Sequence, residues 1–196
     1  MSFHFFFAKI YENAAQSMCL ECAEFIKKGD KILDFGCGSG IVSKNFQDFF
    51  KADILGVDIK DSRVVSIPFK KIKEVSSEKL PFNDLSFDVA LVSYVLHHTK
   101  DPGEILKELK RVAKRIIIYE DLPEGFFSRL RCLFHEISYK ILFQRVKYRF
   151  SFKTEKEWKE LFGGLGLKLI AQKKASGRFN FIDPTSKIIF ILDSVF

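Results

Sequence analysis

The stretch KILDFGCGSG at 31–40 places Gly36, Gly38 and Gly40 directly after an apolar run. Glycine costs backbone entropy, so a cluster of glycines marks a tight turn or a close approach of the backbone to a ligand. The next apolar run, ILGVD, ends at Asp58, about 20 positions beyond the first of these glycines. At that spacing an acid accepts hydrogen bonds from the hydroxyls of a ribose. The glycines and the acid together predict a nucleoside-binding site.

The spacing of the glycines separates two kinds of nucleotide ligand. A dinucleotide-binding turn reads G-x-G-x-x-G, and its third glycine lets the helix pack closely beside a pyrophosphate. Here the pattern is G-x-G-x-G, and Ile41 stands where the third glycine of that fingerprint would fall. The difference indicates a nucleoside without a pyrophosphate and disfavours an NAD-dependent oxidoreductase.

A second set of polar side chains follows the apolar runs further along the chain. Tyr94, His97 and His98 come after DVALVS, and Glu120 and Asp121 close IIIYED. Ligands of open α/β sheets bind at the carboxyl ends of the strands, so these residues are candidates to meet a substrate. A histidine with a pKa of about 6.5 could act there as a general base. The favoured interpretation is that one histidine orients the loop or caps a helix, and the two acids could equally be solvated charges.

The cysteines raise the question of a metal site. Cys19 and Cys22 form a C-x-x-C pair, and Cys132 with His135 could complete four ligands. Both pairs fall on predicted helices and lack the knuckle turns of zinc sites. Cys37 belongs to the glycine turn, where a small side chain fits. We therefore expect reduced, buried thiols and no metal site.

The composition bounds the kind of protein that carries these residues. A chain of 196 residues, 47% of them hydrophobic, suits one globular domain, and 29% charged residues suit a solvated surface. No apolar run approaches the roughly 20 residues that span a bilayer, and the first residues lack the basic start of a signal peptide. These features predict a cytoplasmic protein without stable membrane insertion. The net charge of +7 permits an anionic partner without requiring one.

Apolar runs alternate with helix-like segments along the chain, which predicts an α/β fold. The runs KILDF, ILGVD, DVALVS and IIIYE are too apolar for an alternating pattern, so they suit parallel strands buried on both faces. Helices are expected at 8–27, 39–50 and 102–114. The helix at 102–114 has Asp101 as its cap and Pro102 in its first turn.

Two other segments carry local signals. Residues 60–87 contain Pro68 and Pro81 and have a poor helical stripe, so a shortened helix or an irregular connection is expected there. Thr154 and Glu157 form a capping box for a short helix that ends at glycines. The last two expected strands could form an antiparallel pair at the edge of the sheet.

The stretches ILDFGCGSG, GVDI, LPFNDLSFDVALVSYVLHHTKDP and ILKELKRV are similar, in this order, to successive motifs of class I S-adenosylmethionine-dependent methyltransferases. The small-molecule branch that includes the ubiquinone-biosynthesis methyltransferases is the most similar. The resemblance covers residues 30–121 and continues weakly through FKTEKEW. It implies a doubly wound, mostly parallel seven-stranded sheet with an antiparallel last strand, and S-adenosylmethionine as the cofactor, with S-adenosylhomocysteine as its product.

Carried over position by position, the resemblance implies a set of cofactor contacts. Asp58 would bind the ribose hydroxyls, Ile59 would pack on the adenine, and Ser93 would lie near the methionine end. The family commonly has an aspartate for the adenine amino group where this chain has Ser76, next to Ser77, and a serine implies a weaker hydrogen bond. The residues implied to surround the methionine moiety and the ribose are Asp34, Gly36, Cys37, Gly38 and Gly40.

The resemblance also implies the type of chemistry. Methyl transfer from a sulfonium is an in-line displacement, so holding the reacting atoms in line can supply most of the catalysis. A general base is needed only if the acceptor must lose a proton, and Tyr94, His97 and His98 are the candidates. The expected acceptor is a small molecule, which could be lipophilic. An RNA or protein methyltransferase stays open as an alternative, although SYVL replaces the NPPY-like tetrapeptide of many nucleic-acid amino methylators. A non-catalytic module that keeps the cofactor fold stays open too.

Residues 126–150 interleave aromatic and aliphatic side chains with basic ones, against a single acid, Glu136. This composition suits a lid that also touches anionic lipid, a surface for RNA, or a helical cover with a solvated basic face. The cover is the favoured interpretation. The basic residues of the segment are Arg129, Arg131, Lys140, Arg145, Lys147 and Arg149.

These signals together predict a single methyltransferase domain over residues 1–196, with no internal repeat or linker. Its expected parts are an N-terminal helical cap at 1–29, a cofactor-binding core at 30–121, the basic and aromatic lid or cover at 122–150, and the last helix with the C-terminal strands at 151–196.

Overall fold

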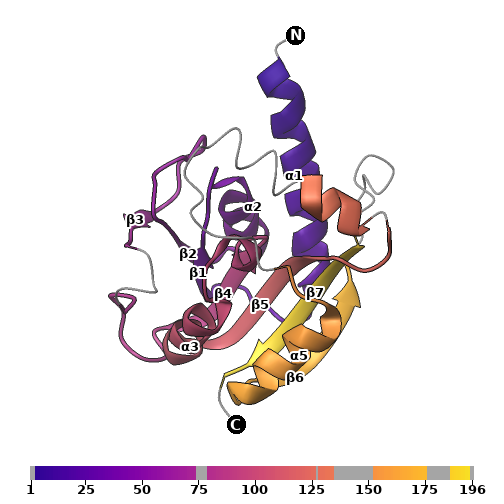
Figure 1. The fold of residues 1–196 in the computed structure, drawn as a ribbon. Helices are drawn as coiled ribbons and strands as arrows, with labels where there is room; N and C mark the ends of the chain where they lie inside the picture. Colours follow the sequence, from indigo (N-terminus) through magenta and orange to yellow (C-terminus); the bar gives the residue numbers. More distant parts are fainter. Residues whose placement is uncertain (1–2, 74–78, 127, 135–151, 176–185, 195–196) are drawn as a thin grey trace.

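The computed structural model describes residues 3–73, 79–126, 128–134, 152–175 and 186–194, with side chains from residue 11 onward. The strands are β1 (Lys31–Phe35), β2 (Asp53–Asp58), β3 (Phe69–Lys71), β4 (Phe87–Ser93), β5 (Ala113–Leu122), β6 (Lys168–Lys174) and β7 (Ser186–Asp193). Among the described residues they form one seven-stranded sheet in the order β3-β2-β1-β4-β5-β7-β6 (Figure 1). Strands β1 to β5 are parallel, and β7 runs antiparallel to both β5 and β6. The predicted α/β sheet, with its antiparallel final pair, is confirmed.

Helices cover both faces of this sheet. They are α1 (Phe3–Glu21), α2 (Ile41–Phe50), the 3-10 turn η1 (Leu96–His98), α3 (Pro102–Val112) and α5 (Glu155–Gly164). Helices α3 and α5 lie in front of the sheet in Figure 1, and α1 and α2 lie on the other face. Strand β5 shows the two layers directly, because Ile116 and Ile118 pack under α3 and α5 while Ile117 and Tyr119 pack under α1 and α2. The strands are therefore buried on both faces, as their apolar runs predict.

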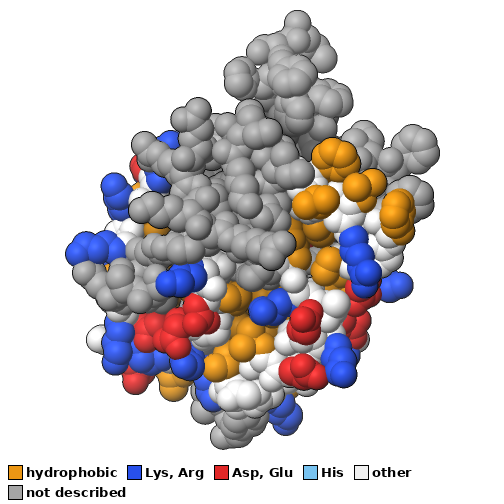
Figure 2. All heavy atoms as spheres, viewed as in Figure 1, with side chains coloured by type: hydrophobic (Ala, Val, Ile, Leu, Met, Phe, Trp, Pro, Cys, Tyr) orange, Lys and Arg blue, Asp and Glu red, His pale blue; other side chains and the backbone are white. Residues whose placement is uncertain are grey.

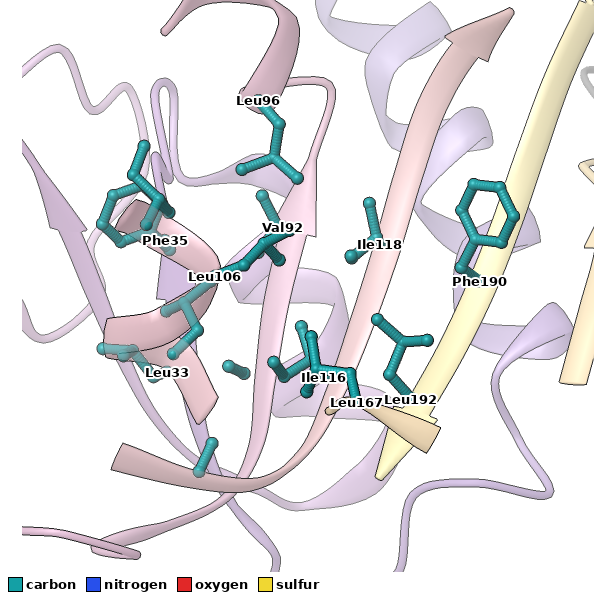
Figure 3. Close-up of a cluster of buried hydrophobic side chains, with 14 of the residues drawn as sticks. Leu33, Phe35, Val92, Leu96, Leu106, Ile116, Ile118, Leu167, Phe190 and Leu192 are labelled. Carbon is teal, nitrogen blue, oxygen red and sulfur yellow. The ribbon is translucent and has the colours of Figure 1, made fainter. Parts of the chain in front are cut away.

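The larger apolar cluster fills the space between the sheet and the front helices. Figure 3 shows Leu106 of α3 directed at the β-strand side chains and Phe190 of β7 on the same side of the sheet. Leu106 and Phe190 are fully buried. Burial of each such side chain stabilises the fold by about 1.5–3 kcal/mol. This packing stabilises the register of the strands, and therefore the level at which their carboxyl ends lie.

The helix-start signals are confirmed. The Asp101 carboxylate accepts hydrogen bonds from the backbone N–H groups of Gly103 and Glu104, and Pro102 is the first helical residue of α3. Thr154 and Glu157 form the reciprocal capping box at the start of α5. Each cap satisfies backbone donors that the first turn of a helix leaves unpaired.

Several boundaries differ from the expected ones. Helix α1 starts at Phe3 and ends at Glu21, so it is shifted toward the N-terminus relative to 8–27. Helix α2 starts at Ile41, because Gly40 has a φ of 77° that no helical residue adopts. Of the shortened helix or irregular connection expected at 60–87, the described residues show the irregular connection, with β3, the first residue of β4 and no helix.

Tyr119 joins α1 to the sheet. Its hydroxyl donates to the backbone carbonyl of Met18 at 3.1 Å and lies 3.0 Å from the Sγ atom of Cys22. None of the four cysteines forms a disulfide, and all four are buried. Burial raises the pKa of Cys19, Cys22 and Cys37 to about 12, so these thiols stay protonated at neutral pH.

Two of the sequence-based hypotheses concern a metal site and a membrane-spanning segment. No group of three or more His, Cys, Asp or Glu residues in the described ranges could hold a metal ion, and His135 lies outside those ranges. Within the same ranges, no helix has both the length and the apolar character needed to cross a membrane.

Candidate functional site

The glycine turn lies between the end of β1 and the start of α2, and it is tied to the neighbouring strand. The backbone N–H groups of Gly36 and Cys37 both donate to the carbonyl of Val57 in β2, at 2.8 and 3.1 Å. Gly36 has a φ of 76°, and a Cβ atom there would fall 2.5 Å from Cγ2 of Val95. Any larger residue at this position would therefore be strained and would also clash with the loop after β4.

The turn leaves one side open. Gly38 has a φ of 50°, and the nearest atom to a Cβ built on it is the Gly36 carbonyl oxygen, at 3.9 Å. At Gly40, by contrast, a Cβ would lie 3.2 Å from Cγ2 of Val65. The middle of the turn thus exposes backbone to a space where a ligand can approach, while its two ends are packed.

Asp58, the last residue of β2, is held beside this turn. Its Oδ2 atom accepts a hydrogen bond from the backbone N–H of Gly38 at 3.0 Å, and its Oδ1 atom accepts one from Lys60 at 3.3 Å. The side chain is half-buried, so its carboxylate is oriented by the backbone and still reaches solvent. Next to it, Ile59 is 60% exposed and offers an apolar surface at the same edge. The carboxylate and the apolar side chain thus follow one another at the carboxyl end of β2.

Asp34 lies below the turn and is fully enclosed. Its Oδ2 atom accepts a short hydrogen bond of 2.5 Å from the hydroxyl of Ser43, in the first turn of α2. Burial raises the pKa of Asp34 to about 6; the Ser43 hydrogen bond lowers it, and the charge of Asp58 raises it. Asp34 therefore titrates much closer to neutrality than an exposed aspartate does.

Ser93 ends β4 at the same edge of the sheet. The register of the strands sets the level at which each strand ends, because Phe35 of β1 pairs with both Val57 of β2 and Val92 of β4. The residues that follow them, Gly36, Asp58 and Ser93, therefore leave the sheet at one level. The Ser93 hydroxyl is buried and has no hydrogen-bond partner among the described residues. A buried hydroxyl without a partner is a position at which a polar ligand atom would be favoured.

The loop after β4 is fixed by a buried pair of side chains. Glu120 accepts a hydrogen bond from the backbone N–H of Leu96 at 2.9 Å through Oε1, and its Oε2 atom lies 2.5 Å from Nδ1 of His97. His97 and Glu120 are 1% and 0% exposed. Burial lowers the pKa of His97, but the charge of Glu120 and the hydrogen bond to it act more strongly together and raise it above its usual value. Phe152 stacks on the His97 ring, with centroids 4.6 Å apart.

The other two candidates after β4 are less enclosed. Tyr94 is half-buried and has a φ of 57°, a left-handed conformation that is rare for a bulky residue. Its backbone N–H donates to the carbonyl of Tyr119 at 2.8 Å, which holds the chain in this conformation. His98 is half-buried, and its ring centroid lies 4.1 Å from that of His97. Backbone strain of this kind is concentrated at functional sites.

The structure brings most of the sequence-predicted residues to the carboxyl edge of the sheet and leaves some elsewhere. The thiol of Cys37 points back into the fold, since its Sγ atom lies 2.8 Å from where a Cβ on Gly56 would be. Its backbone, rather than its side chain, is what faces the turn. Ser76 and Ser77 lie outside the described residues.

Sequence reasoning missed three contributors to this edge. Ser43 is a polar residue on the buried stripe of α2, and that pattern could have pointed to its bond with Asp34. Gly56 must stay small because Cys37 and Ile67 pack against it. Val95 closes over Gly36, a contact between separate loops that no local pattern reveals.

A mostly parallel sheet whose carboxyl edge carries a glycine turn and a strand-end acid defines an α/β protein of the nucleoside-binding kind. Residues 7–172 of the chain match a family model described as a methyltransferase domain. The chain belongs to this family, the class I S-adenosylmethionine-dependent methyltransferases.

The chain is similar to curated proteins from several organisms. The chain is 31% identical to an uncharacterized protein of Methanocaldococcus jannaschii, over 80% of this chain and 72% of that protein. It is 30% identical to a sterol 4-C-methyltransferase of Caenorhabditis elegans, over 65% of this chain and 44% of the relative. It is 29% identical to a ubiquinone biosynthesis O-methyltransferase of Paraburkholderia phymatum, over 52% of this chain and 45% of the relative. The chain spans less than half the length of the last two.

Solved structures share the fold. An S-adenosylmethionine-dependent methyltransferase from Aquifex aeolicus superposes with a TM-score of 0.63 at 17% identity, over 91% of this chain and 89% of that one. A geranyl diphosphate C-methyltransferase from Streptomyces coelicolor superposes with a TM-score of 0.70 at 12% identity, over 94% and 79% of the two chains. At these identities the likeness concerns the architecture alone.

Proposed function

We propose that this chain binds S-adenosylmethionine at the carboxyl edge of its sheet and transfers the methyl group to a small, lipophilic acceptor. The observation that carries the proposal is the seat formed by the open Gly38 backbone and the Asp58 carboxylate that holds it. The glycine turn, the half-buried acid and the partnerless hydroxyl of Ser93 fit a nucleoside with a polar tail.

Each candidate cofactor-binding residue at the carboxyl edge has a proposed role. Asp58 accepts hydrogen bonds from the ribose hydroxyls, and Ile59 packs on the adenine. Ser93 offers its hydroxyl to the methionine end. The adenine amino group is assigned to Ser76 with Ser77, which lie outside the described residues. The residues proposed to surround the ribose and the methionine moiety are Asp34, Gly36, Cys37, Gly38 and Gly40.

The chemistry needs little beyond positioning. The bound cofactor supplies a methyl group on a sulfonium, which is activated for displacement. The protein holds the acceptor in line and excludes water, and orientation alone can remove about 7–11 kcal/mol of a barrier of this type. Tyr94 and His98, half-buried at the same edge, are the proposed contacts to the acceptor and to any proton it loses. His97 is the proposed positioning residue, because its Nδ1 atom is already engaged with Glu120.

The lipophilic character of the acceptor rests on two supports. Curated relatives include a sterol 4-C-methyltransferase and a ubiquinone biosynthesis O-methyltransferase, whose names describe lipophilic acceptors. The described residues after β5 also expose large apolar side chains close to the carboxyl edge, among them Phe126 at 75%. RNA or protein methylation, and a non-catalytic module, are the competing functions.

Transfer of a labelled methyl group separates these functions. The purified chain is incubated with methyl-labelled S-adenosylmethionine and a cell extract, which is then divided into organic-soluble, RNA and protein fractions. The proposal predicts label in the organic-soluble fraction, with an Asp58→Ala variant as the control that transfers little. Label in RNA or protein would contradict the small acceptor, and cofactor binding without any transfer would favour the non-catalytic module.

Protonation of Asp34 should be coupled to cofactor binding. The unliganded chain holds this carboxyl group with a pKa of about 6, against an ordinary value of 3.8. The sulfonium and amino groups of S-adenosylmethionine are cationic, so they favour the ionised form and lower that pKa. Binding is therefore expected to release protons near pH 5 and to weaken as the pH falls below about 6. The stability of the unliganded chain depends on pH in the opposite direction. The free energy of unfolding falls as the pH rises through about 6, because ionisation of the buried carboxyl group is unfavourable.

Calorimetric titrations near pH 5, in two buffers of different ionisation enthalpy, measure this proton release. An Asp34→Asn variant keeps the shape of the side chain and should remove most of the release. Proton uptake on binding, or an unchanged release in Asp34→Asn, would contradict the assignment of this carboxyl group to the site.

A further inference from the structure

The helical residues that follow β5 expose their large apolar side chains, whereas a surface helix normally buries them. Residues 126 and 128–134 are helical, and their large apolar side chains face solvent. These side chains are Phe126, Leu130, Leu133 and Phe134, at 75%, 40%, 51% and 57% exposure. The residues that this helix buries are the small ones, Ser128 and Cys132, at 3% and 5%.

Helical geometry gathers the exposed side chains into one stripe. At 3.6 residues per turn, the four exposed positions fall within an arc of about 100°. Arg129 falls beside one margin of this arc and Arg131 beside the other. Figure 2 shows hydrophobic side chains gathered on this part of the surface, with basic side chains next to them. An apolar stripe with arginines at both margins is the pattern of a helix that lies in a lipid interface.

The opposite side of this helix is anchored to the fold. The Ser128 hydroxyl accepts a hydrogen bond from the backbone N–H of Ser186, at the start of β7, at 3.1 Å. The Arg129 guanidinium donates to the carbonyl of Pro123 at 3.1 Å, a contact that leaves its charge unneutralised. These hydrogen bonds hold the helix against the fold while the apolar stripe faces solvent. It follows the carboxyl end of β5, on the edge of the sheet that carries the proposed cofactor seat.

We propose that the stripe formed by Phe126, Leu130, Leu133 and Phe134 docks on the surface of a bilayer that contains anionic phospholipid. Charge complementarity favours an anionic lipid surface over other apolar partners. The segment 126–150 carries the two marginal arginines and four further Lys or Arg residues, against Glu136 alone. Anionic lipid attracts such a segment by about 1 kcal/mol per basic residue near the surface, or about fivefold in affinity each. The proposal concerns binding and does not depend on turnover.

Flotation of the full chain with lipid vesicles tests the proposal. Vesicles of phosphatidylcholine with phosphatidylglycerol are compared with pure phosphatidylcholine, each at low and high salt. We expect the chain to float with the anionic vesicles at low salt, with several-fold less binding at high salt or without the anionic lipid. The double variant Phe126→Ser with Phe134→Ser should lower the vesicle partition coefficient on the order of tenfold. Arg129→Gln should lower it about fivefold.

Leu20→Ser is the matched control, since Leu20 is 68% exposed near the end of α1 that leads toward the opposite edge of the sheet. It should bind vesicles as the parent chain does. Because all the substituted side chains are exposed, thermal unfolding should change little in any variant.

Absence of flotation, or equal binding by the double Phe variant, would overturn the proposal. So would a concentration-dependent dimer in solution that the double Phe variant abolishes, because the stripe would then bind a second copy. Retention on RNA at low salt without flotation would assign the basic residues to nucleic acid instead.

Discussion

Glu120→Ala should destabilise the fold by about 3–5 kcal/mol, which is the usual cost of removing one partner of a buried pair. The variant leaves the enclosed His97 ring without its carboxylate partner at 2.5 Å. It also leaves the backbone N–H of Leu96 without the acceptor that holds the start of η1. For a chain of this length the melting temperature should fall by about 6–20 °C, measured by calorimetry or circular dichroism.

The neighbouring residue provides the control. Asp121→Ala removes a carboxylate that is 20% exposed and whose Oδ1 atom lies 3.9 Å from Nζ of Lys187, so it should cost clearly less than Glu120→Ala. Adding His97→Ala to Glu120→Ala should restore part of the loss, because the double variant leaves no unpaired buried charge. Equal destabilisation by the two acid-to-alanine changes would contradict the role of Glu120 in fixing the loop after β4.

The raised pKa of His97 gives this pair a pH dependence with a definite sign. The folded pKa lies above its unfolded value, so the stabilisation is fully present below about 6.5 and is lost as the pH rises through the folded pKa. The stability advantage of the parent chain over Glu120→Gln should therefore shrink above neutral pH.

Asp58→Ala should weaken the binding of S-adenosylmethionine and S-adenosylhomocysteine by about 10- to 150-fold. This range corresponds to the loss of hydrogen bonds from the ribose hydroxyls to a charged acceptor, about 1.5–3 kcal/mol. The change also removes the acceptor of the Gly38 N–H group and loosens the turn. Isothermal titration measures the affinity, and a parallel melting curve shows whether the variant stays folded.

Two further variants separate the roles of this carboxylate. Asp58→Asn keeps an oxygen for the Gly38 N–H group but loses the charge, so its affinity should lie between those of the parent chain and Asp58→Ala. Asp53→Ala removes an exposed acid at the other end of the same strand and should leave the affinity unchanged. Full affinity in a folded Asp58→Ala variant would contradict our placement of the ribose.

Local signals in the sequence were sufficient for much of this architecture. Asp101 and Thr154 marked the starts of α3 and α5 because capping depends on residues two or three positions apart. Apolar runs marked β1, β2, β4 and β5 because strands buried on both faces need no polar alternation. Gly36 and Asp58 could be assigned to one edge because parallel strands end together.

Contacts between distant segments could not be inferred in this way. Glu120 and His97 were both expected at the carboxyl edge, but their pairing depends on the register that sets Ser93 beside Tyr119 in β4 and β5. The burial of Cys37 against Gly56 likewise depends on how two strands meet. The span of α1 was misjudged, because the apolar run FHFFF at its start gives no periodic stripe.

Calorimetric titration of the purified parent chain with S-adenosylmethionine, S-adenosylhomocysteine and NAD tests the central claim most directly. The glycine spacing and the Asp58 seat predict micromolar binding of the first two ligands and no binding of NAD. Binding of NAD in their place would contradict a nucleoside site without a pyrophosphate. No binding of any of the three would mean that the turn between β1 and α2 does not hold the cofactor of its family.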